Sequence, residues 1–358
     1  MTTLLSDPSH AGSASLVRVR EDVDGARWDA YVEGRPDASA YHRRGWLELI
    51  GRAFGHEIRP LTCTIDGAIS GVLPLVVMRS RLFGTFAVSL PFLNAGGILA
   101  DDDRAAGALV DAAIAIASER RAEYLELRHT TRRFPNLTER RHRVAMTLDL
   151  LDSVDRHWLA LDRKIRNQVR KAEKSSLTAA HGGLELVPDF YRVFSRNMRD
   201  LGTPVFGHAL FEEVLKTFPD NCRVVCVYRG DQIVAAAIVH WRGAWMEVPW
   251  ASALREYNAM AANMFLYWQM LQLAIERGCS RFEFGRCAPG EGTFQFKKQW
   301  GAVPSPLVWE YWMGAGKPDR FDLHSNDASY GRAAALWRRL PLGISNVLGP
   351  RVVRGIPC

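Results

Sequence analysis

One pattern of apolar and polar residues occurs twice along this 358-residue chain. In the first half, an apolar run over residues 69–78 is followed by a second strand-like run and a loop that contains glycine. A helix over residues 103–121 comes next, and a short strand ends at Arg128. Apolar residues at spacings of three and four indicate the helix. The pattern therefore predicts antiparallel strands, a helix and a further strand.

The second half repeats this order. An apolar run over residues 233–241 leads to a second strand (AWMEVPW), a loop, a helix over residues 259–277 and a strand that ends at Arg286. Such a repeat identifies one structural unit present in two copies. The predicted fold class is α+β with mostly antiparallel sheets. The succession resembles the GNAT (acyl-CoA N-acyltransferase-like) fold, doubled.

The domain organisation follows from this duplication and from changes in composition. We expect a flexible N-terminus over residues 1–14 and a first GNAT-like domain over residues 15–150. A basic helix over residues 151–180 would link it to a second GNAT-like domain over residues 181–315. A basic and apolar tail over residues 316–358 completes the chain.

The loop before each long helix differs from that of coenzyme A-dependent enzymes. In those enzymes a glycine-rich loop holds the pyrophosphate on backbone N–H groups at the start of the helix. The first copy reads AGGILADDDRAAG, where three consecutive aspartates repel phosphate, and the second reads SALREYNAMAAN, without glycine. The sequence therefore favours a donor other than acetyl-CoA, and no cofactor is expected.

Four stretches carry a resemblance to a known family. They are SLPFLNAGG (89–97), KIRNQVRKAEK (164–174), VPWASALREYNAMAANMFLYW (248–268) and EFGRCAPGEGTFQFKKQWGA (283–302). They resemble the FemAB-like aminoacyl-tRNA-dependent transferases, which add amino acids to a peptidoglycan precursor. Within that family the chain is most similar to proteins found beside exosortase/PEP-CTERM and exopolysaccharide systems. The resemblance implies aminoacyl-tRNA as the donor and a cell-envelope or polysaccharide precursor as the acceptor.

The resemblance also implies a catalytic pair. In the family, a Phe-Lys pair lies at the active centre, and it corresponds here to Phe296 and Lys297. An ammonium group stabilises the oxyanion that forms when an amine attacks an ester. Lys298 points in another direction and is a candidate substrate contact. Alternatively, both lysines are solvated groups beside buried aromatic residues.

A strongly basic helix is predicted over residues 154–175. Arg166, Arg170 and Lys174 follow one another at spacings of four, so they share one face. This row suits the phosphates of tRNA or of a substrate. A solvated helix that links the two domains explains it equally well.

Further candidates lie at equivalent places in the two copies. Arg128 and Arg286 close equivalent strands and are either substrate contacts or members of ion pairs at the domain interface, with Glu126 and Glu283 as candidate partners. Glu247 could accept a proton from an attacking amine. The remaining candidates for substrate binding are Trp250, Tyr257, Asn258, Asn94, Gly96 and Gly97. Ordinary packing explains the positions in the second copy equally well, and a tight turn explains those in the first.

Composition and charge refine these expectations. The net charge of +7 and the pI of about 9.2 suit an anionic partner. No metal-binding spacing of His or Cys occurs, and no secretory signal is visible, so we expect a cytoplasmic protein without a metal. The C-terminal stretch mixes arginines with apolar residues and could touch the inner membrane surface. Pro341 and Pro350 should break any helix there, which favours a packed tail.

Two other functions remain open at this stage. An acyl-CoA-dependent N-acetyltransferase would use the same fold with a different donor. A non-catalytic module would use the duplicated fold to bind a polysaccharide or a protein partner. The former would bind coenzyme A, and the latter would retain its ligand after loss of Lys297.

Overall fold

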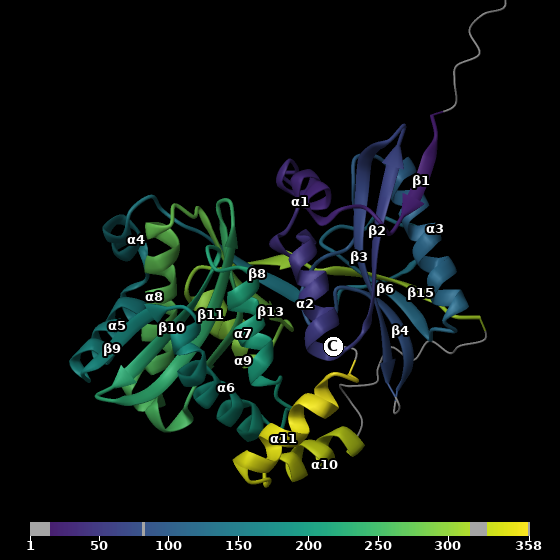
Figure 1. Ribbon diagram of the computed structural model, residues 1–358. Coiled ribbons are helices and arrows are strands. Elements are labelled where there is room, and N and C mark those ends of the chain that lie inside the picture. The colour runs from purple at the N-terminus through teal and green to yellow at the C-terminus, as the bar shows by residue number, and fades with distance from the viewer. Residues whose placement is uncertain (1–14, 81–82, 316–327, 357–358) are drawn as a thin grey trace, which may run out of the picture.

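Two sheets, each covered by helices, form the molecule (Figure 1). The computed structural model describes residues 15–80, 83–315 and 328–356. The first sheet has eight strands in the order β1-β2-β3-β4-β6-β15-β7, with β5 paired to β3, and the second has seven in the order β14-β8-β13-β12-β11-β10-β9. Strands of the first sheet are β1 (Val17–Arg20), β2 (Glu57–Ile65), β3 (Ala68–Ser80), β4 (Gly84–Ser89), β5 (Leu99–Ala100), β6 (Tyr124–His129), β7 (Thr138–Arg140) and β15 (Val308–Met313). Strands of the second sheet are β8 (Val144–Asp149), β9 (Leu177–Gly182), β10 (Cys222–Arg229), β11 (Gln232–Arg242), β12 (Trp245–Ala253), β13 (Arg281–Cys287) and β14 (Val303–Pro306).

The predicted duplication is confirmed in the strand pairing. Each sheet contains one parallel pair, β4 with β6 and β12 with β13, and all other pairs are antiparallel. In each half a long helix joins the two parallel strands: α3 (Asp103–Glu119) in the first and α8 (Ala262–Glu276) in the second. Both helices lie close to the ranges predicted from apolar periodicity. The α+β class with mostly antiparallel sheets is therefore correct.

The two halves are joined by exchanged strands. β8 comes from the range assigned to the first domain, residues 15–150, but pairs with β13 and β14 in the second sheet. β15 lies within residues 181–315, but pairs with β6 and β7 in the first sheet. The strands therefore divide the chain differently from the domain boundaries expected at residues 150 and 315.

The basic segment forms two helices. α4 (Val154–Ala160) and α5 (Arg163–Lys174) replace the single helix expected over residues 154–175. The break occurs because Asp162 caps α5 by accepting a hydrogen bond from the backbone N–H of Lys164. Ile165, Val169 and Ala172 form a buried stripe on α5, and α5 packs against α8. The basic segment therefore belongs to the second half.

Four helices lie between the sheets or cover them from the inner side: α1 (Gly25–Glu33), α2 (Arg44–Phe54), α6 (Val187–Leu201) and α7 (His208–Thr217). α2 of the first half packs against α7 of the second, and α6 packs on β10, β11 and β12. A single hydrophobic core includes residues of both halves, for example Trp46 and Phe218, whose rings are 4.9 Å apart. The two halves therefore share one core.

The C-terminal segment packs on the molecule as two helices, although its prolines were expected to break any helix there. α10 (Ala328–Trp337) and α11 (Leu342–Val353) lie against the second half near α6 (Figure 1). Pro341 precedes α11 as its N-cap residue, and Pro350 lies inside the helix. The expected N-terminal flexible segment, residues 1–14, and parts of the predicted tail, residues 316–327 and 357–358, lie outside the described residues.

Candidate functional site

The parallel strands β12 and β13 pair over three residues and then separate. The paired positions are Trp245 with Arg281, Met246 with Phe282 and Glu247 with Glu283. Opposed residues of a parallel pair point to the same face. Met246 and Phe282 are fully buried, whereas Glu247 and Glu283 retain some exposed surface. Two carboxyl groups therefore lie side by side on one face at the last paired position.

A bulge in each strand marks the place where the strands separate. In β12, Val248 and Pro249 lie opposite the single residue Val239 of β11. In β13, Phe284 and Gly285 lie opposite one residue of β8. Gly285 has φ +74°, and a Cβ atom there would lie 3.2 Å from the carbonyl oxygen of Val248. The bulges in both backbones therefore separate the two strands at this point.

The first half supplies two polar groups to this pair. Nδ2 of Asn94 donates a hydrogen bond to Oε1 of Glu283 at 3.4 Å. Tyr41, in the short helix η1 (Ala40–His42), is 1% exposed, and its ring stacks on that of His240. Burial and then the charges of Glu247 and Glu283 raise the pKa of Tyr41. The site is therefore assembled from both halves of the chain.

Burial raises the pKa of both carboxyl groups. For Glu247, burial and then the charge of Glu283 raise the pKa well above its ordinary value, against the opposing effect of Tyr41. For Glu283, burial raises the pKa to about 6, and Asn94 and Lys297 oppose the rise. Two neighbouring carboxyl groups that cannot both ionise share a proton. Near neutral pH the pair therefore shares a proton, and the larger rise in pKa at Glu247 favours that residue as its holder.

Lys297 lies beside this pair and is held by the bulge of β13. It belongs to the helix α9 (Gly292–Gln299). Its Nζ donates hydrogen bonds to the carbonyl oxygens of Gly285 and Arg286, each at 2.9 Å. An ammonium group has three N–H donors, so at most one is left for a substrate. Burial lowers the pKa of Lys297, and the charges of Cys287 and Glu283 oppose this.

Arg128 and Arg286 meet across one aromatic ring at the junction of the halves. Their guanidinium carbons lie 4.3 Å and 5.5 Å from the ring centroid of Trp309 in β15. Arg128 is 1% exposed, and its Nε donates a hydrogen bond to Oε1 of Glu126 at 2.6 Å. The hydroxyl of Tyr311 donates to the other oxygen of Glu126 at 2.8 Å. Arg128 therefore forms an ion pair with Glu126, which the sequence left open as the alternative to a substrate contact.

Other predicted residues take part in packing. The ring of Phe296 meets that of Tyr267 in α8 at 4.9 Å, and Lys298 is exposed on another side of α9. Trp250 packs against Trp46 and Phe211 behind Tyr41. Tyr257 and Asn258 lie in η3 (Arg255–Met260), which follows the far end of β12. The basic row of Arg166, Arg170 and Lys174 lies on α5, outside α8, and is separate from the carboxyl pair.

The two glycines of the first copy make close contacts within the protein. A Cβ atom at Gly96 would lie 3.1 Å from Cβ of Leu90, and Gly96 has φ +122°. A Cβ atom at Gly97 would lie 2.2 Å from Cδ2 of His129 and 2.9 Å from the carbonyl oxygen of Arg128. These contacts favour the tight-turn explanation over close approach of a ligand.

Gly97→Ala is expected to destabilise the fold by about 1–3 kcal/mol, the usual cost of overpacking. The added methyl group displaces His129, whose Nδ1 contacts Oε2 of Glu310 at 2.6 Å and whose Nε2 accepts from the N–H of Ile98 at 2.9 Å. Gly107→Ala in α3 is the matched control, because no atom lies within 4 Å of its added Cβ. That variant should gain up to about 1 kcal/mol. Equal unfolding free energies of the two variants in urea titrations would contradict this interpretation.

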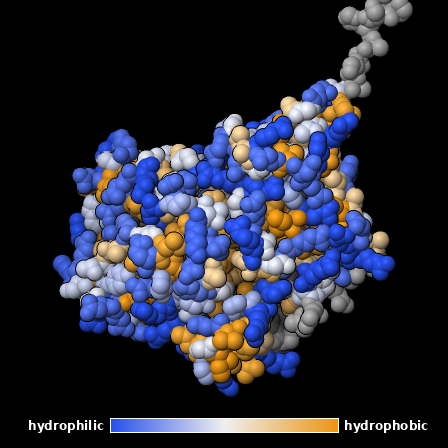
Figure 2. All heavy atoms as spheres, viewed as in Figure 1, coloured by the Kyte–Doolittle hydropathy of each residue, from blue (hydrophilic) through white to orange (hydrophobic). Residues whose placement is uncertain are grey.

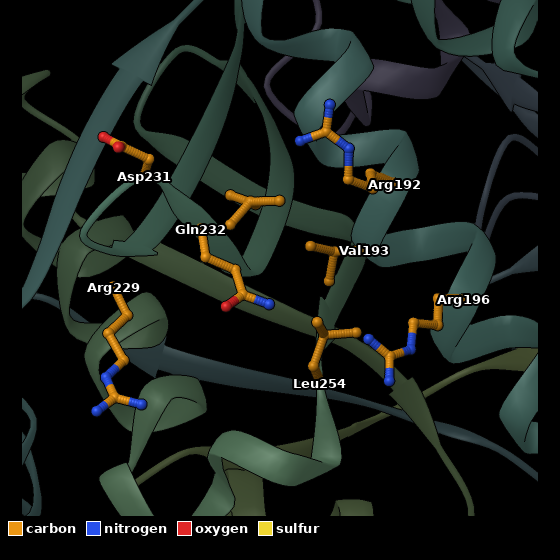
Figure 3. Close-up of a pocket in the computed structure, with 8 residues that line it drawn as sticks. Arg192, Val193, Arg196, Arg229, Asp231, Gln232 and Leu254 are labelled. Atoms are coloured by element: carbon orange, nitrogen blue, oxygen red, sulfur yellow. The ribbon is translucent and has the colours of Figure 1, made fainter.

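A separate pocket of about 480 Å³ lies at the far end of β12 (Figure 3). Three arginines line it, Arg192 and Arg196 from α6 and Arg229 from the end of β10. Arg192 pairs with Asp189, and Arg196 pairs with Glu256. Leu254, which also lines the pocket, is seven residues from Glu247 along an extended strand, or roughly 20 Å. The pocket is therefore distinct from the carboxyl pair.

Neither long helix offers a glycine-rich phosphate loop at its start. The side chain of Asp102 caps α3 by accepting a hydrogen bond from the N–H of Ala105 at 2.8 Å. Residues 255–260, before α8, form η3 without glycine. Among the residues that the structure describes, no group of His, Cys, Asp and Glu could hold a metal ion. Within the same ranges, none of the helices combines the length and the apolar character needed to cross a bilayer.

The sequence did not single out three residues of this site. Glu283 appeared only as a candidate partner for an arginine, and Tyr41 and Trp309 did not appear. Glu283 could have been found from the duplication, because Glu126 occupies the corresponding place in β6, where it lies opposite Val88 at the last paired position. Tyr41 and Trp309 reach the site through long-range packing, for which the local pattern gives no signal.

Comparisons with known proteins agree with the fold. Residues 160–298 match the family model described as an acetyltransferase (GNAT) domain. No curated protein matches the chain. A crystal structure of FemX is similar with a TM-score of 0.64 at 15% identity, covering 82% of this chain and 96% of that one. L-PGS from Bacillus licheniformis is similar with a TM-score of 0.54 at 12% identity, covering 94% and 98%.

A third solved structure has the same duplicated architecture. It is a tandem GNAT protein from the clavulanic acid biosynthesis pathway, similar with a TM-score of 0.54 at 11% identity, covering 85% of this chain and 100% of that one. At these identities the likeness concerns the fold. Together with the domain match in the second half and the two strand–helix–strand units, it shows that this chain has a tandem GNAT fold like that of FemX.

Proposed function

We propose that this chain transfers an aminoacyl group from aminoacyl-tRNA to an amine of a cell-envelope acceptor. Peptidoglycan precursors and exopolysaccharide-related molecules are the acceptor classes that we favour. The observation that carries the proposal is the pair Glu247 and Glu283, two neighbouring carboxyl groups with raised pKa values at the place where β12 and β13 separate. Support for the class of reaction comes from the likeness to FemX and to L-PGS.

The pair suits general acid–base catalysis of acyl transfer. A base with a pKa near 6 is mostly ionised at neutral pH and still accepts a proton readily. Glu283 meets this requirement, since burial raises its pKa to about 6. Glu247 keeps its proton at neutral pH and can act as the acid. We therefore assign the proton-accepting role to Glu283, although the sequence suggested Glu247 for it.

The proposed reaction conserves protons within the pair. The amine of the acceptor attacks the ester carbonyl carbon, and Glu283 takes a proton from the nitrogen. The tetrahedral intermediate collapses when the C–O bond to the ribose breaks, and Glu247 protonates the leaving ribose oxygen. Transfer of one proton from Glu283 to Glu247 then restores the starting state. No enzyme nucleophile is needed, which agrees with direct attack of the amine on an activated ester.

Lys297 is proposed to stabilise the oxyanion of this intermediate. Its Nζ is fixed by the carbonyl oxygens of Gly285 and Arg286, beside Glu283. One N–H group can point to the oxyanion, and a fixed donor in a site of low water content is effective. Asn94 and Tyr41 would orient Glu283 and Glu247.

Lys297→Met is expected to lower the transfer rate by about 10²–10³-fold, as removal of one oxyanion donor does. It also leaves two buried carbonyl oxygens without their partner, which costs about 1–3 kcal/mol of unfolding free energy. Lys298→Met is the matched control, because Lys298 is exposed on the same helix. Single-turnover kinetics and urea unfolding measure the two effects. If Lys298→Met reduced transfer as strongly as Lys297→Met, the assignment of Lys297 would be wrong.

The proposal is tested directly with tRNA charged with labelled amino acids and with cell-envelope fractions. We expect label to move from tRNA to an amine of the acceptor in the presence of the protein, and Glu283→Gln to slow this transfer strongly. Absence of transfer with every charged tRNA would overturn the proposal.

An acyl-CoA-dependent N-acetyltransferase is the second candidate, and the GNAT domain match favours it. Titration calorimetry with acetyl-CoA distinguishes the two, and we expect no binding because neither helix start carries a phosphate loop. A non-catalytic binding module would retain its ligand in both the Glu283 and the Lys297 variants.

A further inference from the structure

The last helix, α11, packs with its apolar face turned outward. Its buried residues are Ser345, Gly349 and Val353, at spacings of four. A Cβ atom at Gly349 would lie 2.8 Å from the carbonyl oxygen of Val205 and 2.9 Å from its Cγ1. The helix therefore approaches the second half through small residues and a close backbone contact. Most of its large apolar side chains remain on the solvent side.

These outward residues form a continuous apolar surface, which we call the C-terminal patch. On α11, Ile344, Val347, Leu348 and Val352 follow the i, i+3, i+4, i+8 spacing of one helix face. Val347 is 59% exposed, and Leu336 of α10 is 66% exposed. Figure 2 shows the apolar atoms gathered over these two helices at the lower end of the molecule. The members of the C-terminal patch are Leu336, Ile344, Val347, Leu348 and Val352.

The charged side chains of the C-terminal segment itself have one sign. Residues 331–356, the part of this segment with described side chains, contain five arginines and no aspartate or glutamate. All five arginines are exposed: Arg332, Arg338, Arg339, Arg351 and Arg354. Long arginine side chains keep their charged ends in water while their stems cover apolar surface. A second copy of this chain on the same surface would bring two sets of like charges together, whereas an anionic surface is complementary to them.

The two C-terminal helices are held firmly to both halves. Nη1 of Arg199 in α6 donates a hydrogen bond to the carbonyl oxygen of Leu340 at 3.0 Å. Nε2 of His56, in the first half, donates to the carbonyl oxygen of Arg354 at 2.9 Å. A Cβ atom at Gly202 would lie 2.7 Å from the carbonyl oxygen of Ala334. The C-terminal patch is therefore presented on a fixed support and need not be ordered on binding.

We propose that the C-terminal patch docks on the surface of a bilayer that contains anionic lipids. A helix that lies in the interface places its apolar side chains below the headgroups and its cationic side chains among them. Each arginine near such a surface adds attraction to the negative potential, which salt weakens. The patch is separate from the carboxyl pair, and the proposal does not depend on the reaction proposed above.

Flotation of the full chain with vesicles tests this proposal. We expect it to float with vesicles of phosphatidylglycerol and phosphatidylcholine, and to remain at the bottom of the gradient with phosphatidylcholine alone. Leu336→Ser combined with Val347→Ser should lower the partition coefficient at least about tenfold, because both side chains leave the bilayer interface. Leu159→Ser is the matched control, because Leu159 is 69% exposed on α4, away from the patch.

The arginines give a second, independent measurement. Arg338→Gln and Arg339→Gln should each lower the partition coefficient about fivefold, and added salt should have a similar effect. Arg255→Gln, an exposed arginine of η3, should leave it unchanged. Equal flotation of the patch variants and the controls would overturn the proposal. So would a protein that shows no flotation and forms dimers that Val347→Ser dissociates in light scattering, since the occupant would then be a second copy.

Discussion

Glu283→Gln is expected to slow aminoacyl transfer by about 10²–10⁴-fold, the usual contribution of a general base. Glutamine keeps the size of the side chain and the contact with Asn94, but it cannot accept the proton of the attacking amine. In the unmodified protein the rate should fall as the pH drops through about 6, because Glu283 then becomes protonated. Single-turnover rates across this pH range, with substrate in excess of its dissociation constant, measure both effects.

The same substitution should make the protein more stable at neutral pH. The pKa of Glu283 is about 6 in the folded protein, against an ordinary value of 4.5. The folded state therefore binds the proton more tightly, so the unmodified protein loses stability as the pH rises from 4.5 through 6. Glu283→Gln removes this loss and should gain on the order of 1 kcal/mol at pH 7. A residue that lowers stability while serving catalysis is typical of an active site.

Glu276→Gln provides the control for this experiment, because Glu276 is exposed at the end of α8. It should change neither the transfer rate nor the dependence of stability on pH. If Glu283→Gln were as active as the control, Glu283 would have no catalytic role. If it were inactive and also destabilised, the loss of activity would reflect damage to the fold.

Arg128→Met is expected to cost about 3–5 kcal/mol of unfolding free energy, the largest stability effect that we predict. Arg128 is 1% exposed, and methionine fills a similar volume without its charge. Glu126 would keep the hydrogen bond from Tyr311 but lose the guanidinium, leaving a buried carboxylate without a cation. The cation–π contact with Trp309 would also be lost. Equilibrium unfolding in guanidinium chloride measures the change.

The double variant Arg128→Met, Glu126→Gln separates charge from packing. Removal of both charged groups leaves no unpaired ion, so more than half of the lost stability should return. If the double variant were as unstable as Arg128→Met, packing against Trp309 rather than the ion pair would account for the loss. If Arg128→Met were as stable as the unmodified protein, the buried pair would contribute nothing.

The repeated pattern was sufficient to predict the fold class and the duplication. Apolar periodicity located α3 and α8, and the runs before them became β3, β4, β11 and β12. Asp162 follows the local rule for helix capping, and its cap divides the basic segment into two helices. The continuous charge pattern of the sequence did not reveal this break. Proline rules were misleading at Pro341 and Pro350, because proline is tolerated before a helix and tertiary packing holds α11 around the second.

The site was harder to predict because its residues come from segments that are far apart in the sequence and meet where two paired strands separate. Lys297 was predicted as a site residue only through a family resemblance, and its hydrogen bonds to Gly285 and Arg286 depend on a bulge that no local pattern reveals. The pairing of Glu247 with Glu283 requires the register of two strands that are 36 residues apart at these positions, since 283 − 247 = 36. Register of parallel strands depends on the packing of the whole sheet.

The exchange of β8 and β15 has a consequence for the order in which the molecule can be made. The ribosome releases residues 15–140 long before β15, and Tyr311 lies 185 residues beyond Glu126, its hydrogen-bonding partner. In the first sheet, β6 and β7 therefore lack their partner strand β15 until most of the second half has been synthesised. Completion of both sheets late in synthesis means that the mature site, which draws on both halves, cannot form on a partial chain.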